Sequence, residues 1–188
     1  MKNYQTSEIK NVVLLGAPGS GKTTFAEAMA FEGKVIDRRG SIENENTLSD
    51  NTDLEHSNRR SIYSTILYTE FMNHKLNIID APGSDDFSGG LFAAFKVADV
   101  GLMLFNAQNG FEVGSEIQSR YAKTYNVPLV GVINQLDSEK ANWEGTLESI
   151  ASFSKVKPIV VQYPVNPGPG FDAFIDVLLM NCLLYTSP

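Results

Sequence analysis

The chain has 188 residues, of which 43% are hydrophobic, so it suits one compact domain and leaves room for a second small one. Its formal net charge is −7 and it contains no basic run, which argues against direct binding to DNA or RNA, because charge-driven binding needs clustered lysine and arginine. No segment has the pattern of a secretion signal or a membrane span, and one cysteine, Cys182, cannot form an internal disulfide. We therefore expect a cytoplasmic protein that binds neither nucleic acid nor membrane directly.

Residues 16–23, GAPGSGKT, fit the phosphate-binding pattern G-x-x-x-x-G-K-[ST] in full. Residues 11–15 predict a buried strand before the loop, and residues 24–31 predict a helix after it. Glycines let the loop turn its N–H groups toward phosphate, Lys22 reaches the β- and γ-phosphates, and the Thr23 hydroxyl ligates Mg²⁺. The alternative is a glycine-rich turn that caps an ordinary helix. The expected nucleotide contacts are Ala17, Pro18, Gly19, Ser20, Gly21, Lys22, Thr23 and Thr24.

Residues 33–60 form a long polar segment without the rhythm of strands and helices. A loop of this length inside a compact domain is usually functional or disordered, and its position suits a nucleotide-sensing switch. An insertion without a role is the alternative. Residues 61–71 then alternate as an edge strand should, and they can pair antiparallel to the buried strand predicted over residues 75–80.

The rest of the chain predicts an α/β fold of the P-loop NTPase type, with a mostly parallel sheet and helices on both faces. This rests on buried strands at residues 100–107 and 128–134 and on helices at residues 91–98 and 113–125. Toward the carboxyl end the regular alternation of buried strands and helices stops, and we expect three further elements. They are a strand at residues 156–161, a Pro/Gly loop at 163–170, and a helix that starts at 171–178 and buries the apolar run 174–184.

Asp80-Ala81-Pro82-Gly83 follows the 75–80 strand and fits D-x-x-G. Asp80 is expected to face Mg²⁺ through water, and the Gly83 N–H to meet the γ-phosphate. The same four residues are good turn formers, so the motif alone would indicate a turn. Its position downstream of the phosphate loop favours the nucleotide site.

Asn134-Gln135-Leu136-Asp137 closes the 128–134 strand and is similar to N-K-x-D. The Asp137 carboxylate can accept hydrogen bonds from N1–H and the exocyclic amine of guanine, a donor pair that adenine lacks. Asn134 is expected to bond the purine and nearby backbone, and Gln135 to cover part of the base where lysine is usual. An Asx turn at the strand end is the alternative. We expect the three motifs to meet at one edge of the sheet.

In this order the motifs resemble the GTPase domain of translational GTPases, and further matches resemble elongation factor G. These matches are residues 46–50, 86–87, 89–90, 97–99 and 110–116. The Gly-Ser-Gly-Lys-Thr-Thr form of the loop is similar to the divergent elongation factor G-like branch, and the likeness extends from residue 11 to about 179. It implies GTP/GDP and Mg²⁺ as cofactors, the ribosome as partner through domains absent from this chain, and a monomer.

Three positions depart from the family pattern. Ser84 stands where a histidine positions the attacking water, which implies slow or absent hydrolysis and leaves Lys22 and Gly83 as the other catalytic candidates. Ser61 aligns with the switch threonine that ligates Mg²⁺, although it can also simply begin a strand. Gly19 stands where the family often has an aspartate. The metal ligands implied are thus Thr23, Ser61 and, through water, Asp80.

The resemblance also predicts domain limits. A GTP-binding domain would cover residues 1–157, with switch I at about 33–62, and an inserted subdomain would begin over 158–181. Residues 182–188 fit no family pattern, and we interpret them as an artefactual tail on an amino-terminal fragment. Three functions are compatible with the sequence. They are a GTPase of the elongation factor G type, a GTP-dependent binding switch with little turnover, and a P-loop ATPase or small-molecule kinase, which Asp137 disfavours.

Overall fold

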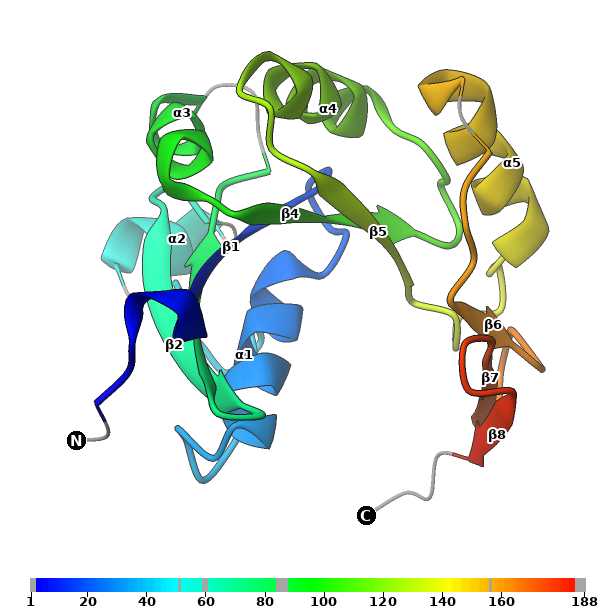
Figure 1. Ribbon diagram of the computed structural model, residues 1–188, viewed down its shortest axis with the longest axis horizontal. Coiled ribbons are helices and arrows are strands. Elements are labelled where there is room, and N and C mark those ends of the chain that lie inside the picture. The colour runs from blue at the N-terminus through cyan, green and yellow to red at the C-terminus, as the bar shows by residue number, and fades with distance from the viewer. Residues whose placement is uncertain (1–2, 51, 59–60, 84–87, 156, 185–188) are drawn as a thin grey trace. The chain divides into compact units, whose positions relative to one another are not determined.

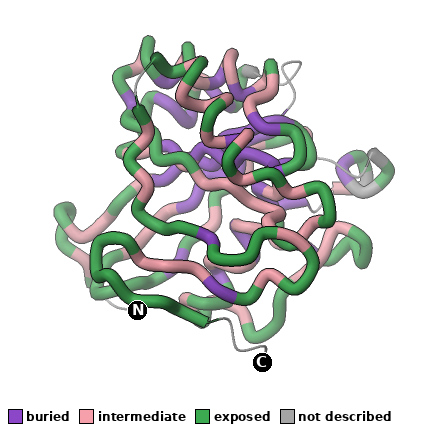
Figure 2. Tube along the Cα trace, turned by 90° about the vertical axis from the view of Figure 1, so that its right-hand side faces the viewer, coloured by how far each residue is buried: buried purple, intermediate pink, exposed green. Residues whose placement is uncertain are grey.

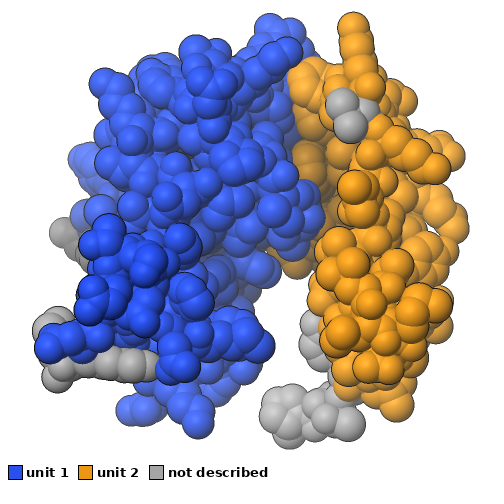
Figure 3. Space-filling model, viewed as in Figure 1, with its two compact units in different colours: residues 1–104, 113–132 blue, residues 105–112, 133–188 orange. Residues whose placement is uncertain are grey.

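The computed structural model describes residues 3–50, 52–58, 61–83, 88–155 and 157–184. It divides into two compact units, which Figure 3 colours separately. The first unit comprises residues 1–104 and 113–132, and the second comprises 105–112 and 133–188. The boundary expected between residues 157 and 158 stays a prediction.

The first unit is built on a twisted sheet with the strand order β2-β3-β1-β4-β5 (Figure 1). β1 pairs in parallel with β3 and with β4, whereas β2 pairs antiparallel with β3 along the edge. The predicted α/β class, with its mostly parallel sheet and antiparallel edge strand, is therefore confirmed. The strands are β1 Ile9–Leu15, β2 Thr65–Phe71, β3 His74–Asp80, β4 Val100–Asn106 and β5 Leu129–Asn134.

Helices cover both faces of this sheet, α1 on one face and α3 and α4 on the other (Figure 1). Alternate residues of β1 point to opposite faces, so Val12 and Leu14 pack with Ala26 of α1 while Val13 and Leu15 are buried on the other side. Figure 2 shows many of the buried positions in the middle of the trace, with exposed positions common at its margins. The helices of this unit are η1 Thr6–Glu8, α1 Lys22–Glu32, α2 Asp53–Asn58, α3 Ser88–Val97 and α4 Val113–Thr124.

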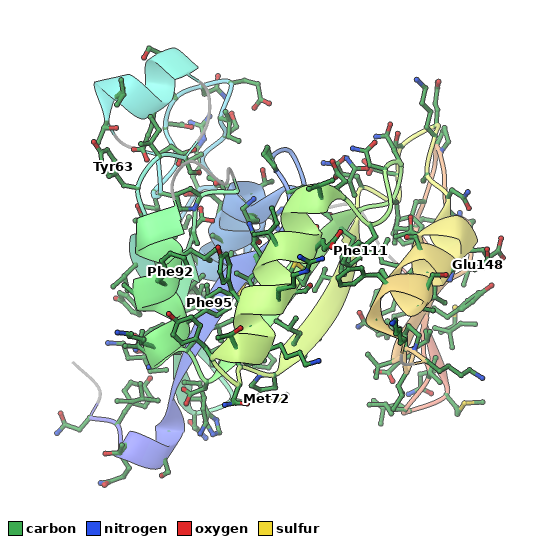
Figure 4. The ribbon with its side chains drawn as sticks, turned by 90° about the horizontal axis from the view of Figure 1, so that it is seen from above. Tyr63, Met72, Phe92, Phe95, Phe111 and Glu148 are labelled. Carbon is green, nitrogen blue, oxygen red and sulfur yellow. The ribbon has the colours of Figure 1, made fainter. Side chains whose placement is uncertain are left out.

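Aromatic side chains join α3 to α4. Phe92 and Phe95 project from α3 toward α4 (Figure 4), where Phe92 and Tyr121 form a T-shaped pair with ring centroids 4.8 Å apart. Phe95 stacks on Tyr125 at 5.9 Å. Such pairs add about 0.5–1.5 kcal/mol each beyond the area that they bury. This packing fixes α4, which supplies a contact to the phosphate loop described below.

The polar segment of residues 33–60 is more structured than the sequence predicted. Within its described part, α2 occupies Asp53–Asn58, and Thr47, Ser49 and Asp50 are buried. A buried glutamate of α1, Glu27, accepts hydrogen bonds from the backbone N–H groups of Gly40, at 3.0 Å, and of Leu48. Hydrogen bonds to the Glu27 carboxylate therefore attach this polar segment to α1.

The second unit contains α5 Trp143–Ser154 and a three-stranded antiparallel sheet of β6 Gln162–Pro164, β7 Ala173–Asp176 and β8 Asn181–Leu184. The helix predicted at 171–178 and over the apolar run 174–184 was wrong, because β7 and β8 form a hairpin there. The chain reverses at residues 177–180, and Ala173–Asp176 pairs antiparallel with Asn181–Leu184, so the apolar run doubles back on itself instead of continuing as one helix. The strand predicted at 156–161 was also wrong for its described residues, where Ile159 is exposed.

The helix α5 was not predicted from the sequence. Asn142 caps it by accepting a hydrogen bond from the Gly145 N–H at 2.9 Å, and its apolar side is anchored by Phe153, which stacks on Phe111 at 4.1 Å. An Asn cap followed by apolar residues at helical spacing was the available signal. Across the part of the chain that the structure describes, no helix has the length and apolar character needed to cross a membrane.

Candidate functional site

The phosphate loop turns sharply between β1 and α1. Gly16, Gly19 and Gly21 adopt positive φ angles of 135°, 78° and 90°. A Cβ on Gly16 would lie 2.4 Å from the carbonyl oxygen of Leu104, so both its conformation and its surroundings require glycine. Within the loop, Ala17 and Ser20 are buried, whereas Pro18, Gly19 and Thr24 face solvent.

Lys22 is held against this loop although it carries a charge. Its side chain is 7% exposed, and its ammonium donates hydrogen bonds to the carbonyl oxygens of Gly16, at 2.9 Å, and Ala17, at 3.1 Å. Buried cations are stable only with such partners. The loop therefore carries a positive charge at the place that the sequence pattern predicts for phosphate.

Three hydroxyl and carboxyl groups meet beside the loop. The Thr23 hydroxyl donates to Asp80 Oδ2 at 2.8 Å and lies 3.2 Å from the Ser61 hydroxyl. The parallel register places Leu14 of β1 opposite Asp80, so the ends of β1 and β3 bring these residues together. Among the described residues, none lies at good hydrogen-bonding geometry to the buried Asp80 Oδ1, although the Ser49 hydroxyl is close enough to this carboxylate to lower its pKa. An oxygen set with one unsatisfied carboxylate oxygen fits a magnesium ion or one of its waters.

Burial raises the pKa of the Asp80 carboxyl, although the hydroxyls of Thr23 and Ser49 and the Lys22 ammonium oppose the rise. The carboxylate of Asp50, itself buried, adds to it. The folded protein therefore holds this proton more tightly than the unfolded chain does. The sign of the linkage follows, because protonation of Asp80 favours the folded state and that contribution is lost as pH rises through the raised pKa.

Replacing Asp80 with Asn is therefore expected to stabilise the nucleotide-free protein at pH 7, with the gain disappearing in acid. The same change removes an anionic oxygen beside Thr23, so the Mg²⁺ concentration needed for tight nucleotide binding should rise roughly tenfold or more. Urea unfolding at pH 7 and pH 4, together with a Mg²⁺ titration of nucleotide binding, measures both effects. A loss of stability at pH 7 with unchanged Mg²⁺ dependence would contradict this account.

Gly83 packs directly onto the phosphate loop. A Cβ there would lie 2.5 Å from Lys22 Nζ and 3.0 Å from both the Gly16 carbonyl oxygen and the Pro18 nitrogen. The backbone of the D-x-x-G motif therefore approaches the lysine more closely than any side chain would allow. Residues 84–87 lie outside the described residues, so Ser84, which the sequence analysis placed in the catalytic set, has no structural description.

Several buried polar residues of the site were not predicted. Gln118 of α4 accepts a hydrogen bond from the Gly16 N–H at 2.6 Å, and its amide nitrogen is 3.4 Å from the Gly16 carbonyl oxygen. Glu27 binds the backbone of the polar segment, and Asp50, which belongs to that segment, acts on the Asp80 carboxyl, as described above. A glutamine on an amphipathic helix resembles any surface glutamine in sequence, so nothing in the pattern marks Gln118. Asp50 was noted as a family match but was not given a role.

The motif of residues 134–137 lies in the second unit. Gln135 has a positive φ of 60°, and its side-chain oxygen accepts a hydrogen bond from Asn106 Nδ2 at 2.6 Å. The Asn134 carbonyl oxygen accepts from the Ala107 N–H at 2.9 Å, and Asp137 is exposed. The turn therefore presents the Asp137 carboxylate to solvent on a fixed backbone. The convergence of this motif with the other two stays a prediction.

Comparison with known proteins gives consistent results. A family model described as the elongation factor Tu GTP binding domain matches residues 7–185. Elongation factor G of Dehalococcoides mccartyi is 31% identical over 181 residues, which are 96% of this chain and 26% of that protein. Elongation factor G of Salinibacter ruber is 29% identical over 184 residues, 98% of this chain and 26% of that protein. The chain thus spans about a quarter of the length of these relatives.

Solved structures agree. A crystal structure of a protein from Thermus thermophilus superposes on this chain with a TM-score of 0.88 and 30% sequence identity. The match covers 96% of this chain and 27% of that one.

Proposed function

Because the chain belongs to the family of elongation factor Tu-type GTP-binding domains, we propose that it binds Mg²⁺-GTP and hydrolyses it on the ribosome, as the GTP-binding domain of an elongation factor G-like protein. The observation that carries the proposal is the junction of the first two motifs. Thr23 donates to Asp80 at 2.8 Å, and the D-x-x-G glycine leaves no space for a side chain beside the Lys22 ammonium. Translocation and ribosome release both fit this role, and both belong in the cytoplasm.

The residues of the first unit would hold the triphosphate. The N–H groups of the loop and the Lys22 ammonium offer positive charge to the β- and γ-phosphates, where it stabilises the charge that develops during phosphoryl transfer. Thr23, Ser61 and Asp80 would hold Mg²⁺, which neutralises phosphate charge when bound. Gly83 would bring its N–H to the γ-phosphate. The chain's own contribution is thus the orientation and charge balance of the phosphates.

Guanine selection is assigned to the second unit. Asp137 is exposed, and the left-handed turn at Gln135 fixes its backbone, so its carboxylate is available to accept the paired donors of guanine. Asn134 would bond the purine from the adjoining position. Adenine offers no such donor pair, which makes an ATPase or small-molecule kinase the weaker reading of the same loop.

A GTP-dependent binding switch with little hydrolysis is the second candidate. The specific observation that favours it is Ser84, since a serine hydroxyl cannot extend as far as the imidazole that the family uses to position water. In that case GTP would change the affinity for a partner such as the ribosome without being consumed. Ser84 lies outside the described residues, and the shorter reach of its side chain is what favours this candidate.

A single-turnover assay with radiolabelled GTP, enzyme in excess and Mg²⁺ present, tests the proposal. We expect saturable GTP binding, displacement by GDP but not by ATP, and slow release of phosphate. Absence of GTP binding would refute the nucleotide site, and displacement by ATP as effective as by GDP would refute its selectivity for guanine and with it the GTPase proposal.

Replacing Ser84 with His is expected to raise the single-turnover hydrolysis rate about 100-fold, because a positioned imidazole contributes roughly that much to water attack. GTP affinity should change by less than about twofold, and Ser84→Ala should behave like the parent protein. A fast parent rate that Ser84→His leaves unchanged would remove this position from the mechanism and would also exclude the switch reading.

A further inference from the structure

Glu55 is a charged side chain that the fold buries almost completely. Its exposed fraction is 1%, and it lies in the short helix α2, away from the phosphate loop in sequence. Burial of a carboxylate is costly unless hydrogen bonds replace its hydration. Glu55 accepts four of them, two on each oxygen.

One oxygen serves the helix itself. Oε2 accepts from the Thr52 N–H at 3.3 Å and the Thr52 hydroxyl at 2.8 Å, while that hydroxyl accepts from the Glu55 N–H at 3.3 Å. This reciprocal arrangement is a capping box, which occurs at many helix starts. A capping role needs no second acceptor, so it does not explain what the other oxygen does.

The other oxygen reaches beyond the helix. Oε1 accepts from the backbone N–H groups of Ile62, at 3.0 Å, and Tyr63, at 3.1 Å. These groups directly follow Ser61, whose hydroxyl lies 3.2 Å from that of Thr23. The anchored backbone and the hydroxyl beside the phosphate loop are therefore one residue apart.

From these contacts we propose that Glu55 is a positioning residue for the magnesium site. Its Oε1 fixes the backbone at Ile62 and Tyr63 and so holds the Ser61 hydroxyl beside Thr23. This inference rests on the proposed binding of Mg²⁺-nucleotide by the same residues. It adds that part of the switch segment is held by a carboxylate of its own rather than by the nucleotide alone.

The protonation state of Glu55 agrees with this role. Burial alone would raise its pKa, but the hydrogen bonds from Ile62, Tyr63 and Thr52 outweigh burial and lower it. The side chain is therefore ionised at neutral pH, and bonds to an ionised acceptor are stronger than those between neutral groups.

The test compares four variants by the Mg²⁺ concentration that gives half-maximal binding of a fluorescent GTP analogue. Glu55→Ala and Ser61→Ala should each raise that concentration about tenfold, and the double variant should be no worse than either, since both changes remove the same hydroxyl from the site. The Mg²⁺ concentration for Glu55→Gln should lie between those of the parent protein and Glu55→Ala, because the glutamine amide oxygen can still accept the hydrogen bonds from Ile62 and Tyr63. Additive effects, or no effect of Glu55→Ala, would overturn the proposal.

Two controls separate positioning from folding. Thr52→Val removes the hydroxyl of the capping box and leaves Oε1 free to bind Ile62 and Tyr63, so it should change the Mg²⁺ requirement by less than about twofold. Glu148→Gln alters an exposed glutamate of α5, labelled in Figure 4, and should have no effect. A rise in the Mg²⁺ requirement for Thr52→Val as large as for Glu55→Ala would reduce Glu55 to a helix cap.

Hydrogen exchange of the nucleotide-free protein tests the anchor independently of nucleotide binding. Glu55→Ala should speed exchange of the Ile62 and Tyr63 amides at least tenfold while leaving those of α1 unchanged. Unchanged exchange would refute the anchor even if nucleotide binds. Faster exchange in a protein that binds no GTP would instead refute the proposed function and leave the anchor established.

Discussion

Replacing Asp137 with Asn is expected to weaken GTP binding about 1,000-fold, or about 4 kcal/mol. The carboxylate can accept from two donors of guanine, and bonds to a charged acceptor contribute about 1.5–3 kcal/mol each. The asparagine side chain keeps one oxygen acceptor, but its NH₂ group would face one of the two N–H donors of guanine. Equilibrium titration with a fluorescent GTP analogue measures the loss.

Xanthosine triphosphate provides the compensating ligand, because its base carries a carbonyl where guanine carries the exocyclic amine. The variant should bind it more tightly than it binds GTP, while the parent protein should show the reverse preference. Glu139→Gln, at a nearby exposed acid, is the matched control and should leave GTP binding unchanged. Equal loss of both nucleotides in Asp137→Asn would show that the residue supports the turn rather than reading the base.

Replacing Gly83 with Ala is expected to weaken triphosphate binding about 100-fold, with a smaller effect on GDP. The new Cβ would lie 2.5 Å from Lys22 Nζ, so the lysine or the D-x-x-G backbone must move. Displacing the ammonium weakens its charge-assisted bonds to phosphate, and displacing the backbone moves the Gly83 N–H. Binding assays with GTP and GDP on the purified variant measure both losses.

Gly89→Ala is a suitable control because Gly89 lies in the same region of sequence and has no atom within 4 Å of an added Cβ. It sits in α3, where alanine favours the helix, so the variant should bind both nucleotides normally and be slightly more stable. Normal GTP binding by Gly83→Ala would show that the close approach of the Gly83 backbone to Lys22 is not needed for nucleotide binding.

The motifs and buried strands could be predicted because their patterns are local. The motif GAPGSGKT between a strand and a helix specifies the conformation of the loop without help from distant residues. The apolar runs that form β1, β3, β4 and β5 are short and bounded by turn residues, which favours buried strands. The antiparallel pairing of β2 followed from its alternation. These features together gave the fold class and the first-unit residues that meet around Lys22 and Asp80.

Prediction was poorest where partners distant in sequence decide the structure. The 174–184 run reads equally well as a helix or a hairpin, and the pairing of β7 with β6 and β8 decided it. In the sequence, the buried acids Glu27 and Glu55 look like ordinary solvent-exposed glutamates, and nothing around them predicts burial. Only the backbone N–H groups that they reach, up to 21 residues away for Glu27, reveal why they are buried.

The hydrogen bonds from Gly40 and Leu48 to Glu27 divide the polar segment into two parts, residues 40–48 and the residues that follow them. Gly40 and Leu48, the first and last residues of the part 40–48, are both hydrogen-bonded to α1, the helix that begins at the phosphate loop. The Thr65 hydroxyl donates to the carbonyl oxygen of Ser49 at 3.0 Å, so the residue that follows this part is tied to the start of β2. Under the proposed function, we therefore expect the described residues around Ser61, rather than Gly40 and Leu48, to differ between the GTP-bound and GDP-bound states.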